Sequence, residues 1–386
     1  MRVLIIRTFP DKLNLKSYNV QEVGLAKALT LKGHVCDIAL YNKREADWEQ
    51  EYKFKHNGKE FGFKIYWLHG YNLFKNGFMP TVKKLFPKYD VIQVHEYDQL
   101  MSWQLYSKQI KPTIIYHGPY YDKYAKGYNL KCKLFDTLFL PRRKHDDIVV
   151  LSKSTLATEL MQKKGFRNVT TVGVGIDLGN FGDNVNSYTE KSKKLRERNL
   201  LYVGKLEERR NVYFLVEVFR EIHKINSDFK LTIIGNGDKE YKDKFLDYIK
   251  DEIDVGDIVY KEKAQQTELV EYYNEASFFL LASNYEIFGM VLLEAMYFGA
   301  PVISSVNGGS CTLIQNGYNG FVIDEFEKEA WADCILKSIQ NECLLEKMKI
   351  NARKTIEKGF TWDVLADSFI QAYEYAIAGY EENKNV

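Results

Sequence analysis

Short apolar runs alternate with helical patterns along almost the whole chain, and this rhythm restricts the possible folds more than any other feature. In the first half, the runs expected as strands are 3–6, 35–40, 64–68, 91–94, 113–116, 148–151 and 169–172. Helical patterns lie between them, for example at 20–32 and 154–164. A repeated strand–helix–strand order predicts a parallel sheet with helices on both faces.

The rhythm stops at 182–198, a polar and charged stretch that is typical of an interdomain linker. A second series follows, with expected strands at 200–203, 231–234, 258–260, 278–281, 302–304 and 321–323. The C-terminal part is expected to be helical, at 328–341, 344–357 and 362–378. A length of 386 residues allows about two domains. We therefore expect two Rossmann-like domains, 1–181 and 182–361, which face a central cleft.

Composition limits the class of protein. Hydrophobic residues make up 45% of the chain and aromatic residues 14%, which supports sizeable cores and argues against disorder. Since no apolar run reaches about 18 residues, no membrane-spanning helix is expected. The N-terminal run reads as a strand and not as a signal peptide. Five cysteines without a C-x-x-C pair indicate reduced thiols in a cytoplasmic protein.

The net charge of +2 conceals an asymmetry between the halves. Residues 1–180 hold 29 Lys/Arg and 17 Asp/Glu, whereas residues 181–386 hold 25 and 35. In the basic half, lysines stand among aromatic and apolar residues at 71–78, 81–88 and 120–144. This pattern fits a solvated surface or docking on an anionic membrane. Nucleic-acid binding is disfavoured because no nucleic-acid module motif is present.

Cationic residues follow the first expected strand of the second half. Strand 200–203 ends in Gly204 and Lys205, and Arg210 lies five residues further on. A mobile ammonium and a forked guanidinium suit a diphosphate, although the same residues also fit an ordinary polar surface loop.

The next expected strand, 231–234, ends in Gly235-Asn236-Gly237. These glycines could let a ligand approach the backbone, or simply form a tight turn. The third glycine of a dinucleotide fingerprint is replaced by Glu240, which disfavours a nicotinamide-dependent oxidoreductase. No D-x-D motif occurs, so we expect phosphate charge to be neutralised by side chains and a helix dipole, without a metal.

Two acids bracket an apolar segment after strand 278–281. Glu286 precedes a turn at Gly289, and Glu294 lies in the helix that follows. Glu294 could accept hydrogen bonds from a ribose diol, and Glu286 from a sugar hydroxyl. The plainer alternatives are a buried acid that caps backbone and a solvated loop acid. The glycines and the two cations nearby favour the functional interpretation.

With seven residues between Glu286 and Glu294, this segment resembles the E-x7-E signature of family 4 retaining glycosyltransferases, which have the GT-B fold. The resemblance covers nearly the whole chain, and its first-half pieces include 25–35, 91–95, 114–118, 149–152 and 175–177. It implies that the 362–386 segment packs back on the first domain.

The resemblance also implies roles for individual residues. Lys205 and Arg210 would bind the donor diphosphate, Glu294 the ribose, and His117 the donor sugar. The transferred sugar would contact Glu286 and a short backbone run: Ile287, Phe288, Gly289 and Met290. Gly204, Gly235 and Gly237 would complete the donor site, and Lys263 would lie near the base. The residues expected to carry catalysis are Glu286, His117, Lys205 and Arg210.

The sequence departs from the family in the loop after the first strand, where Lys16-Ser17 stands in place of a Gly-Gly pair. Lys16 could supply charge there instead. We expect Lys16, Ser17, Tyr18 and His95 on the acceptor side.

The predicted reaction moves a hexosyl unit from a nucleotide diphosphate sugar to an acceptor hydroxyl, and the resemblance implies that the anomeric configuration is retained. A UDP-sugar is favoured and GDP-mannose is next. The acceptor is expected to be a lipid-linked or cell-surface glycan intermediate at the inner face of a membrane. No cofactor, metal or nucleic acid is expected. The alternatives are a sugar-nucleotide epimerase and a non-catalytic sugar-nucleotide-binding protein.

Overall fold

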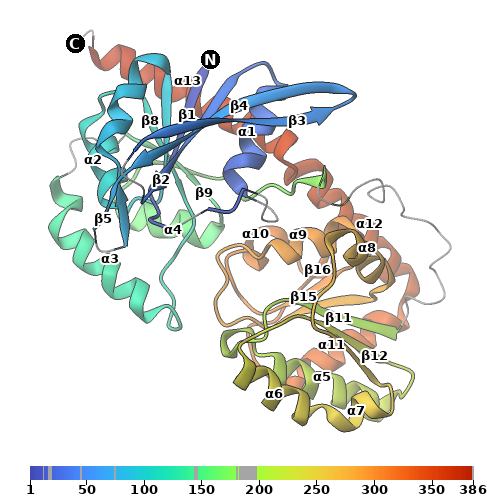
Figure 1. Ribbon diagram of the computed structural model, residues 1–386. Helices are drawn as coiled ribbons and strands as arrows, with labels where there is room; N and C mark the ends of the chain where they lie inside the picture. Colours follow the sequence, from blue (N-terminus) through green and yellow to red (C-terminus); the bar gives the residue numbers. More distant parts are fainter. Residues whose placement is uncertain are drawn as a thin grey trace. The chain divides into compact units, whose positions relative to one another are not determined.

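The computed structural model describes residues 1–11, 13–15, 20–43, 46–73, 75–142, 147–179, 181 and 198–384. The chain divides into two compact units. The first unit comprises Met1–Asp177 and Trp362–Val386, and the second comprises Leu178–Thr361 (Figure 1). The C-terminal segment from Trp362 thus belongs to the first unit. Among the described helices, none has the length and apolar character needed to cross a bilayer.

The first unit is built on an eight-stranded sheet in the order β10-β9-β8-β7-β1-β2-β4-β3. Its strands are β1 (Arg2–Arg7), β2 (Val35–Asn42), β3 (Trp48–His56), β4 (Lys59–His69), β7 (Val91–His95), β8 (Thr113–His117), β9 (Val149–Ser152) and β10 (Asn168–Thr171). The pairing is parallel except between β3 and β4, which run antiparallel. A small separate hairpin joins β5 (Tyr71–Leu73) and β6 (Asn76–Phe78).

Helices cover both faces of this sheet (Figure 1). They are α1 (Gln21–Leu31), α2 (Leu100–Lys108), α3 (Lys126–Leu138), α4 (Thr155–Lys163) and α13 (Trp362–Lys384), with 3-10 turns η1 (Pro80–Lys88) and η2 (Leu140–Arg142). Helices α1 and α13 pack together on one face. Apolar side chains from η1, α2, α3 and α4 form the core on the other face.

The indole of Trp362 fixes α13 to the rest of the first unit. A Cβ added at Gly24 would lie 2.2 Å from the ring, and one added at Gly175 would lie 2.5 Å from it. Only glycine leaves room for the indole at these two positions.

The second unit holds a six-stranded parallel sheet in the order β13-β12-β11-β14-β15-β16. Its strands are β11 (Asn199–Val203), β12 (Lys230–Ile234), β13 (Ile258–Lys261), β14 (Phe278–Leu281), β15 (Val302–Ser304) and β16 (Gly320–Val322). Its helices are α5 (Val212–Ile225), α6 (Lys239–Tyr248), α7 (Lys250–Asp254), α8 (Gln266–Glu275), α9 (Met290–Tyr297), α10 (Ser310–Leu313), α11 (Lys328–Gln340) and α12 (Glu342–Gly359), with the turn η6 (Glu208–Arg210).

Each sheet reverses its strand order at one place. Strand β1 lies between β2 and β7, and β11 lies between β12 and β14. Open parallel sheets bind ligands at such a switch point, beyond the carboxyl ends of the strands. In the second unit, the predicted donor-site residues from Gly204 to Arg210 follow β11 and those from Glu286 to Glu294 follow β14, so these two groups lie at this position.

Candidate active site

The loop after β11 carries the first predicted cation. The Tyr202 hydroxyl donates to the Lys205 carbonyl at 2.8 Å, which fixes the backbone of the turn. The Lys205 side chain is 64% exposed, and its Nζ lies 3.3 Å from the Glu207 carboxylate. Because the lysine side chain is mostly in solvent, this ion pair contributes little to stability, and the ammonium can turn to an anionic ligand.

Arg210 and Glu286 form an ion pair that joins the loops after β11 and β14. Arg210 also donates to the Ser283 hydroxyl at 3.1 Å. Arg209, which the sequence analysis did not single out, lies 3.5 Å from the Glu286 carboxylate and donates to the Tyr285 carbonyl at 2.8 Å. The structure thus brings two predicted catalytic residues into contact at the switch point.

Backbone conformation and backbone contacts fix the turn that follows Glu286. Gly289 has φ +76°, a left-handed conformation that suits glycine, and α9 begins directly after it. A Cβ at Gly309 would lie 1.5 Å from the Phe288 carbonyl oxygen, and Gly308 donates to the Glu286 carbonyl at 3.0 Å. The start of α9 carries the partial positive charge of a helix N-terminus, which favours an anion. Phe288 is buried, so we expect it to contribute through its backbone.

Glu294 is almost completely buried at 1% exposure. Its carboxylate accepts hydrogen bonds from the Tyr273 hydroxyl at 2.9 Å and from the Gln266 side-chain amide at 3.1 Å. Both donors come from α8, and sequence reasoning missed them because nothing local links them to Glu294. They hold the acid in a fixed orientation, and its ribose contact remains a prediction.

Two of the predicted donor-site glycines already have a role in packing. A Cβ at Gly235 would lie 1.8 Å from the Gly204 carbonyl oxygen, and one at Gly237 would lie 2.1 Å from the Leu206 carbonyl oxygen. These two glycines therefore allow the loops after β11 and β12 to approach each other closely. Lys263 is exposed after β13. Ligand contacts at these residues remain predictions.

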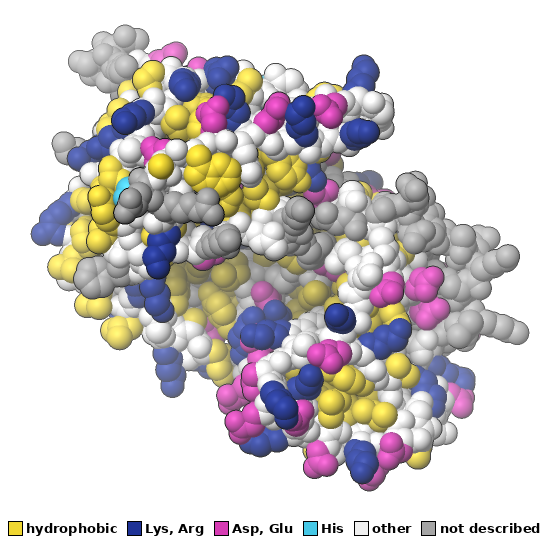
Figure 2. Space-filling model, viewed as in Figure 1, with side chains coloured by type: hydrophobic (Ala, Val, Ile, Leu, Met, Phe, Trp, Pro, Cys, Tyr) yellow, Lys and Arg dark blue, Asp and Glu magenta, His cyan; other side chains and the backbone are white. Residues whose placement is uncertain are grey.

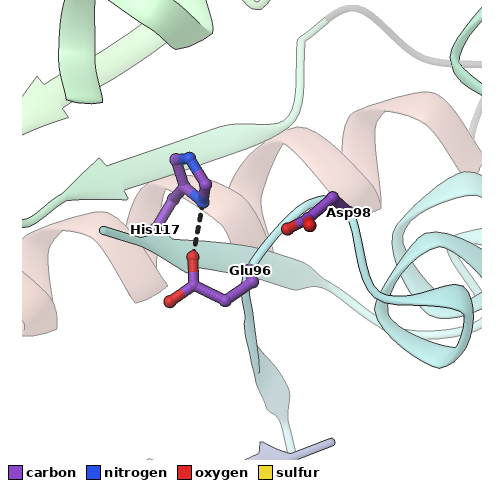
Figure 3. A group of neighbouring side chains, drawn as sticks. All are labelled: Glu96, Asp98 and His117. Carbon is purple, nitrogen blue, oxygen red and sulfur yellow. Dashed lines mark ion pairs between the residues drawn. The ribbon is translucent and has the colours of Figure 1, made fainter. Parts of the chain in front are cut away.

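In the first unit, His117 at the end of β8 lies in a buried charged group (Figure 3). Its Nδ1 lies 2.6 Å from Glu96, whose other carboxylate oxygen lies 3.4 Å from Lys153 Nζ. Burial alone would raise the pKa of Glu96, but the charges of Lys153 and His117 outweigh it and hold that pKa well below its usual value. Nε2 of His117 has no hydrogen-bond partner among the described residues. Since His117 is 0% exposed, a sugar could reach Nε2 only after a covering side chain moves.

Asp98 completes a group of three possible metal ligands. One ligand atom each from Glu96, Asp98 and His117 lies within 4.8 Å of the others. However, Lys153 pairs with Glu96, and Lys131 pairs with Asp98 at 2.9 Å. These lysines already balance the acids, so the group fits a positioned histidine better than a cation site. Sequence reasoning missed Glu96, although an acid directly after a buried parallel strand is a signal for it.

The remaining acceptor-side predictions have different outcomes. His95 is buried, with Nδ1 3.5 Å from Glu22 and Nε2 3.3 Å from the Gln93 amide. Burial lowers the pKa of His95 to about 4, so the ring is neutral near pH 7. These contacts give it a packing role, and an acceptor contact remains a prediction. Lys16, Ser17 and Tyr18 lie outside the described residues.

The fold of the chain is shared with solved structures of other proteins. Two units of this kind, with the C-terminal helix in the first, make up the GT-B fold. Sucrose-phosphate synthase from Thermosynechococcus elongatus has the same fold, with a TM-score of 0.69 and 17% identity over 98% of this chain and 100% of that one. The HepE protein of Anabaena, solved with UDP, has a TM-score of 0.68 and 13% identity over 97% of this chain and all of its own.

Residues 186–355, which lie within the second unit, match the family model described as glycosyl transferases group 1. The capsular polysaccharide biosynthesis glycosyltransferase CapM of Staphylococcus aureus is 26% identical over 236 residues, which is 59% of this chain. The chain spans 61% of the length of that relative.

Proposed function

We propose that this protein is a retaining glycosyltransferase that moves a hexosyl unit from a nucleotide diphosphate sugar to an acceptor hydroxyl. The observation that carries the proposal is the Arg210–Glu286 pair beside Lys205 at the switch point of the second unit. This position combines cations, a helix N-terminus and a carboxylate. Those groups suit a diphosphate and the hydroxyls of the sugar attached to it.

The chemical step breaks the bond between the anomeric carbon and a diphosphate oxygen. Negative charge develops on the leaving diphosphate, where Lys205, Arg210 and the start of α9 stabilise it. Losing one such preorganised contact costs roughly 3 kcal/mol, or about a hundredfold in rate. The acceptor hydroxyl attacks from the face that the leaving group occupies, and the leaving phosphate assists by accepting the hydroxyl proton.

The remaining residues position the donor. Glu294 accepts hydrogen bonds from the ribose hydroxyls, and Glu286 and His117 contact hydroxyls of the transferred sugar. Contacts from Gly204, Gly235, Gly237 and Lys263 complete the nucleotide side. The charge of the leaving group is met by side chains and a helix dipole, so the proposed reaction uses neither a metal nor a cofactor.

We further propose a UDP-sugar as donor, with GDP-mannose as the next choice. The UDP complex of HepE, which shares the fold, supports uridine. A lipid-linked or cell-surface glycan intermediate is the proposed acceptor. The capsular-polysaccharide role in the name of CapM and the basic first half of the chain support it. The protein would then work in the cytoplasm at the inner face of a membrane.

A thermal-shift panel of uridine, guanosine, adenosine and thymidine diphosphate sugars tests the proposal. A ligand at a hundred times its Kd adds about 2.7 kcal/mol to the free energy of unfolding. The selected donor should then release nucleoside diphosphate in the presence of acceptor, and NMR of the product gives its anomeric configuration. Binding without turnover would favour a sugar-nucleotide-binding protein, and release of a free epimerised sugar without acceptor would favour an epimerase.

A further inference from the structure

Helix α3 of the first unit exposes three leucines on its outer face. Leu130, Leu134 and Leu138 are 63%, 58% and 51% exposed. They stand four residues apart and so form one stripe along the helix. The opposite face is buried through Cys132 and Phe135. A helix on a soluble surface normally turns its leucines to the core, so an exposed stripe indicates an interaction site.

Basic residues flank the stripe. Lys126 and Lys133 are exposed on α3, and Lys123 is exposed just before it. Asp136, the single acid of α3, forms an ion pair with Lys164 within the fold. It also accepts hydrogen bonds from the hydroxyls of Tyr97 and Tyr121, each at 3.0 Å. The outer face of α3 is therefore apolar and positively charged. Figure 2 shows hydrophobic and basic side chains interspersed where α3 lies in Figure 1.

The basic segment at η1 does not share this character. In η1, the apolar side chains of Val82, Leu85 and Phe86 are buried in the core of the first unit. The exposed residues there are two prolines and three lysines: Pro80, Lys83, Lys84, Pro87 and Lys88. The sequence pattern of lysines among apolar residues therefore has two origins. In η1 it marks a core turn, and in α3 it marks an exposed apolar stripe.

We propose that the leucine stripe of α3 inserts into the headgroup boundary of an anionic lipid bilayer. An amphipathic helix binds such an interface when its apolar face enters the acyl boundary and its lysines meet anionic headgroups. A second copy of the chain is a poorer occupant, because a two-fold contact through α3 would bring two sets of lysines together. The inference extends the lipid-linked acceptor proposed above. Its test uses no sugar, so either proposal can fail without the other.

Vesicle co-sedimentation tests the docking surface. The probes are phosphatidylcholine vesicles with and without about one third phosphatidylglycerol, at low salt. Burying a leucine side chain corresponds to about a tenfold change in partitioning. The Leu130→Ser/Leu134→Ser variant should therefore bind the anionic vesicles at least about tenfold more weakly than wild type. The Lys126→Glu/Lys133→Glu variant should also lose binding, and its loss should shrink as salt is added.

Two matched variants serve as controls. Ile225→Ser removes an apolar side chain that is 72% exposed in the second unit, and Lys239→Glu reverses a lysine that is 88% exposed there. Both should bind like wild type, and thermal unfolding checks that every variant is folded. The proposal is overturned if wild type ignores the anionic vesicles or if Leu130→Ser/Leu134→Ser binds as wild type does. It is also overturned if the leucine substitutions only dissociate a dimer in sedimentation.

Discussion

Nδ1 of His117 forms an ion pair with the carboxylate of Glu96 at 2.6 Å, while Nε2 has neither an ion-pair nor a hydrogen-bond partner among the described residues. A carboxylate on one ring nitrogen sets the tautomer of a histidine and fixes its orientation. In the proposed reaction, Glu96 is thus a positioning residue, and Nε2 meets the donor sugar once a covering side chain moves.

We predict that Glu96→Ala lowers kcat by about tenfold to a hundredfold, since a hydrogen bond to a charged group contributes about 1.5–3 kcal/mol. Glu96→Gln should restore most of the activity, because its carbonyl oxygen can accept a hydrogen bond from an N–H at Nδ1. The imidazole nitrogen shifts of His117, measured by NMR, should change in the alanine variant and stay close to wild type in the glutamine variant. Equal kcat values for wild type and Glu96→Ala would contradict this role.

Arg210, which pairs with Glu286, predicts a loss of kcat when its guanidinium is removed or replaced. Arg210→Ala should reduce kcat about a hundredfold through the loss of one contact to the leaving diphosphate. Arg210→Lys should recover only part of this, because an ammonium cannot replace the two parallel donors of a guanidinium. Steady-state kinetics measures both variants, with Lys239→Ala as a surface control. The role is wrong if Arg210→Lys and Arg210→Ala both match wild type.

The contact between Gly24 and the Trp362 indole predicts a stability defect. Gly24→Ala would place a methyl group 2.2 Å from the ring, so the indole or α1 must shift. Overpacking of this kind typically costs about 1–3 kcal/mol. Denaturant unfolding should show this loss in the first unit. Gly127→Ala, also in a helix but with nothing within 4 Å of the new methyl, should leave stability unchanged or slightly raised. If the two variants are equally stable, the packing explanation fails.

His95 predicts a pH dependence of stability. Burial lowers its pKa in the folded state to about 4, whereas an unfolded histidine titrates near 6.5. The unfolded state therefore binds the proton first, so stability is complete above about pH 6.5 and falls as the pH drops towards 4. The loss from this group is roughly 3 kcal/mol over that interval.

Denaturant unfolding at a series of pH values measures this effect. The His95→Gln variant should show a flatter dependence than wild type between pH 6.5 and 4.5. The comparison stops at pH 4.5 because of Glu96. Its pKa is lowered in the folded state, so it causes a separate loss of stability once the pH falls below the usual pKa of a glutamate. His56→Gln changes an exposed histidine and should keep the wild-type slope. An unchanged slope in His95→Gln would show that burial does not govern this titration.

Much of the fold could be predicted because the buried strands are short and almost purely apolar. Strand β14, for example, is the run Phe278–Leu281. Strand β3 was missed, since Trp48–His56 alternates charged with aromatic residues and pairs antiparallel at the edge of the sheet. Helix α3 was also missed, because its exposed leucines disturb the expected amphipathic pattern.

Candidate site residues could be proposed from the sequence where they stand at or after the end of an apolar run, as Lys205 and His117 do, since the carboxyl ends of parallel strands share one edge of a sheet. Residues that position them could not be predicted. Tyr273 reaches Glu294, and Lys153 reaches Glu96, through tertiary contacts between distant segments. The packing role of Gly235 was hidden for the same reason, as its neighbour Gly204 belongs to another strand end.

The central claim is that the second unit binds a nucleoside diphosphate at the switch point between β11 and β14. Calorimetric titration with UDP and GDP tests it most directly. Wild type should bind at least one of the two. Lys205→Ala and Glu294→Ala should each weaken that binding by about tenfold or more, since a hydrogen bond to a charged group contributes about 1.5–3 kcal/mol. Lys239→Ala should leave it unchanged. If both site variants keep the wild-type affinity, the nucleotide does not bind where this account expects it.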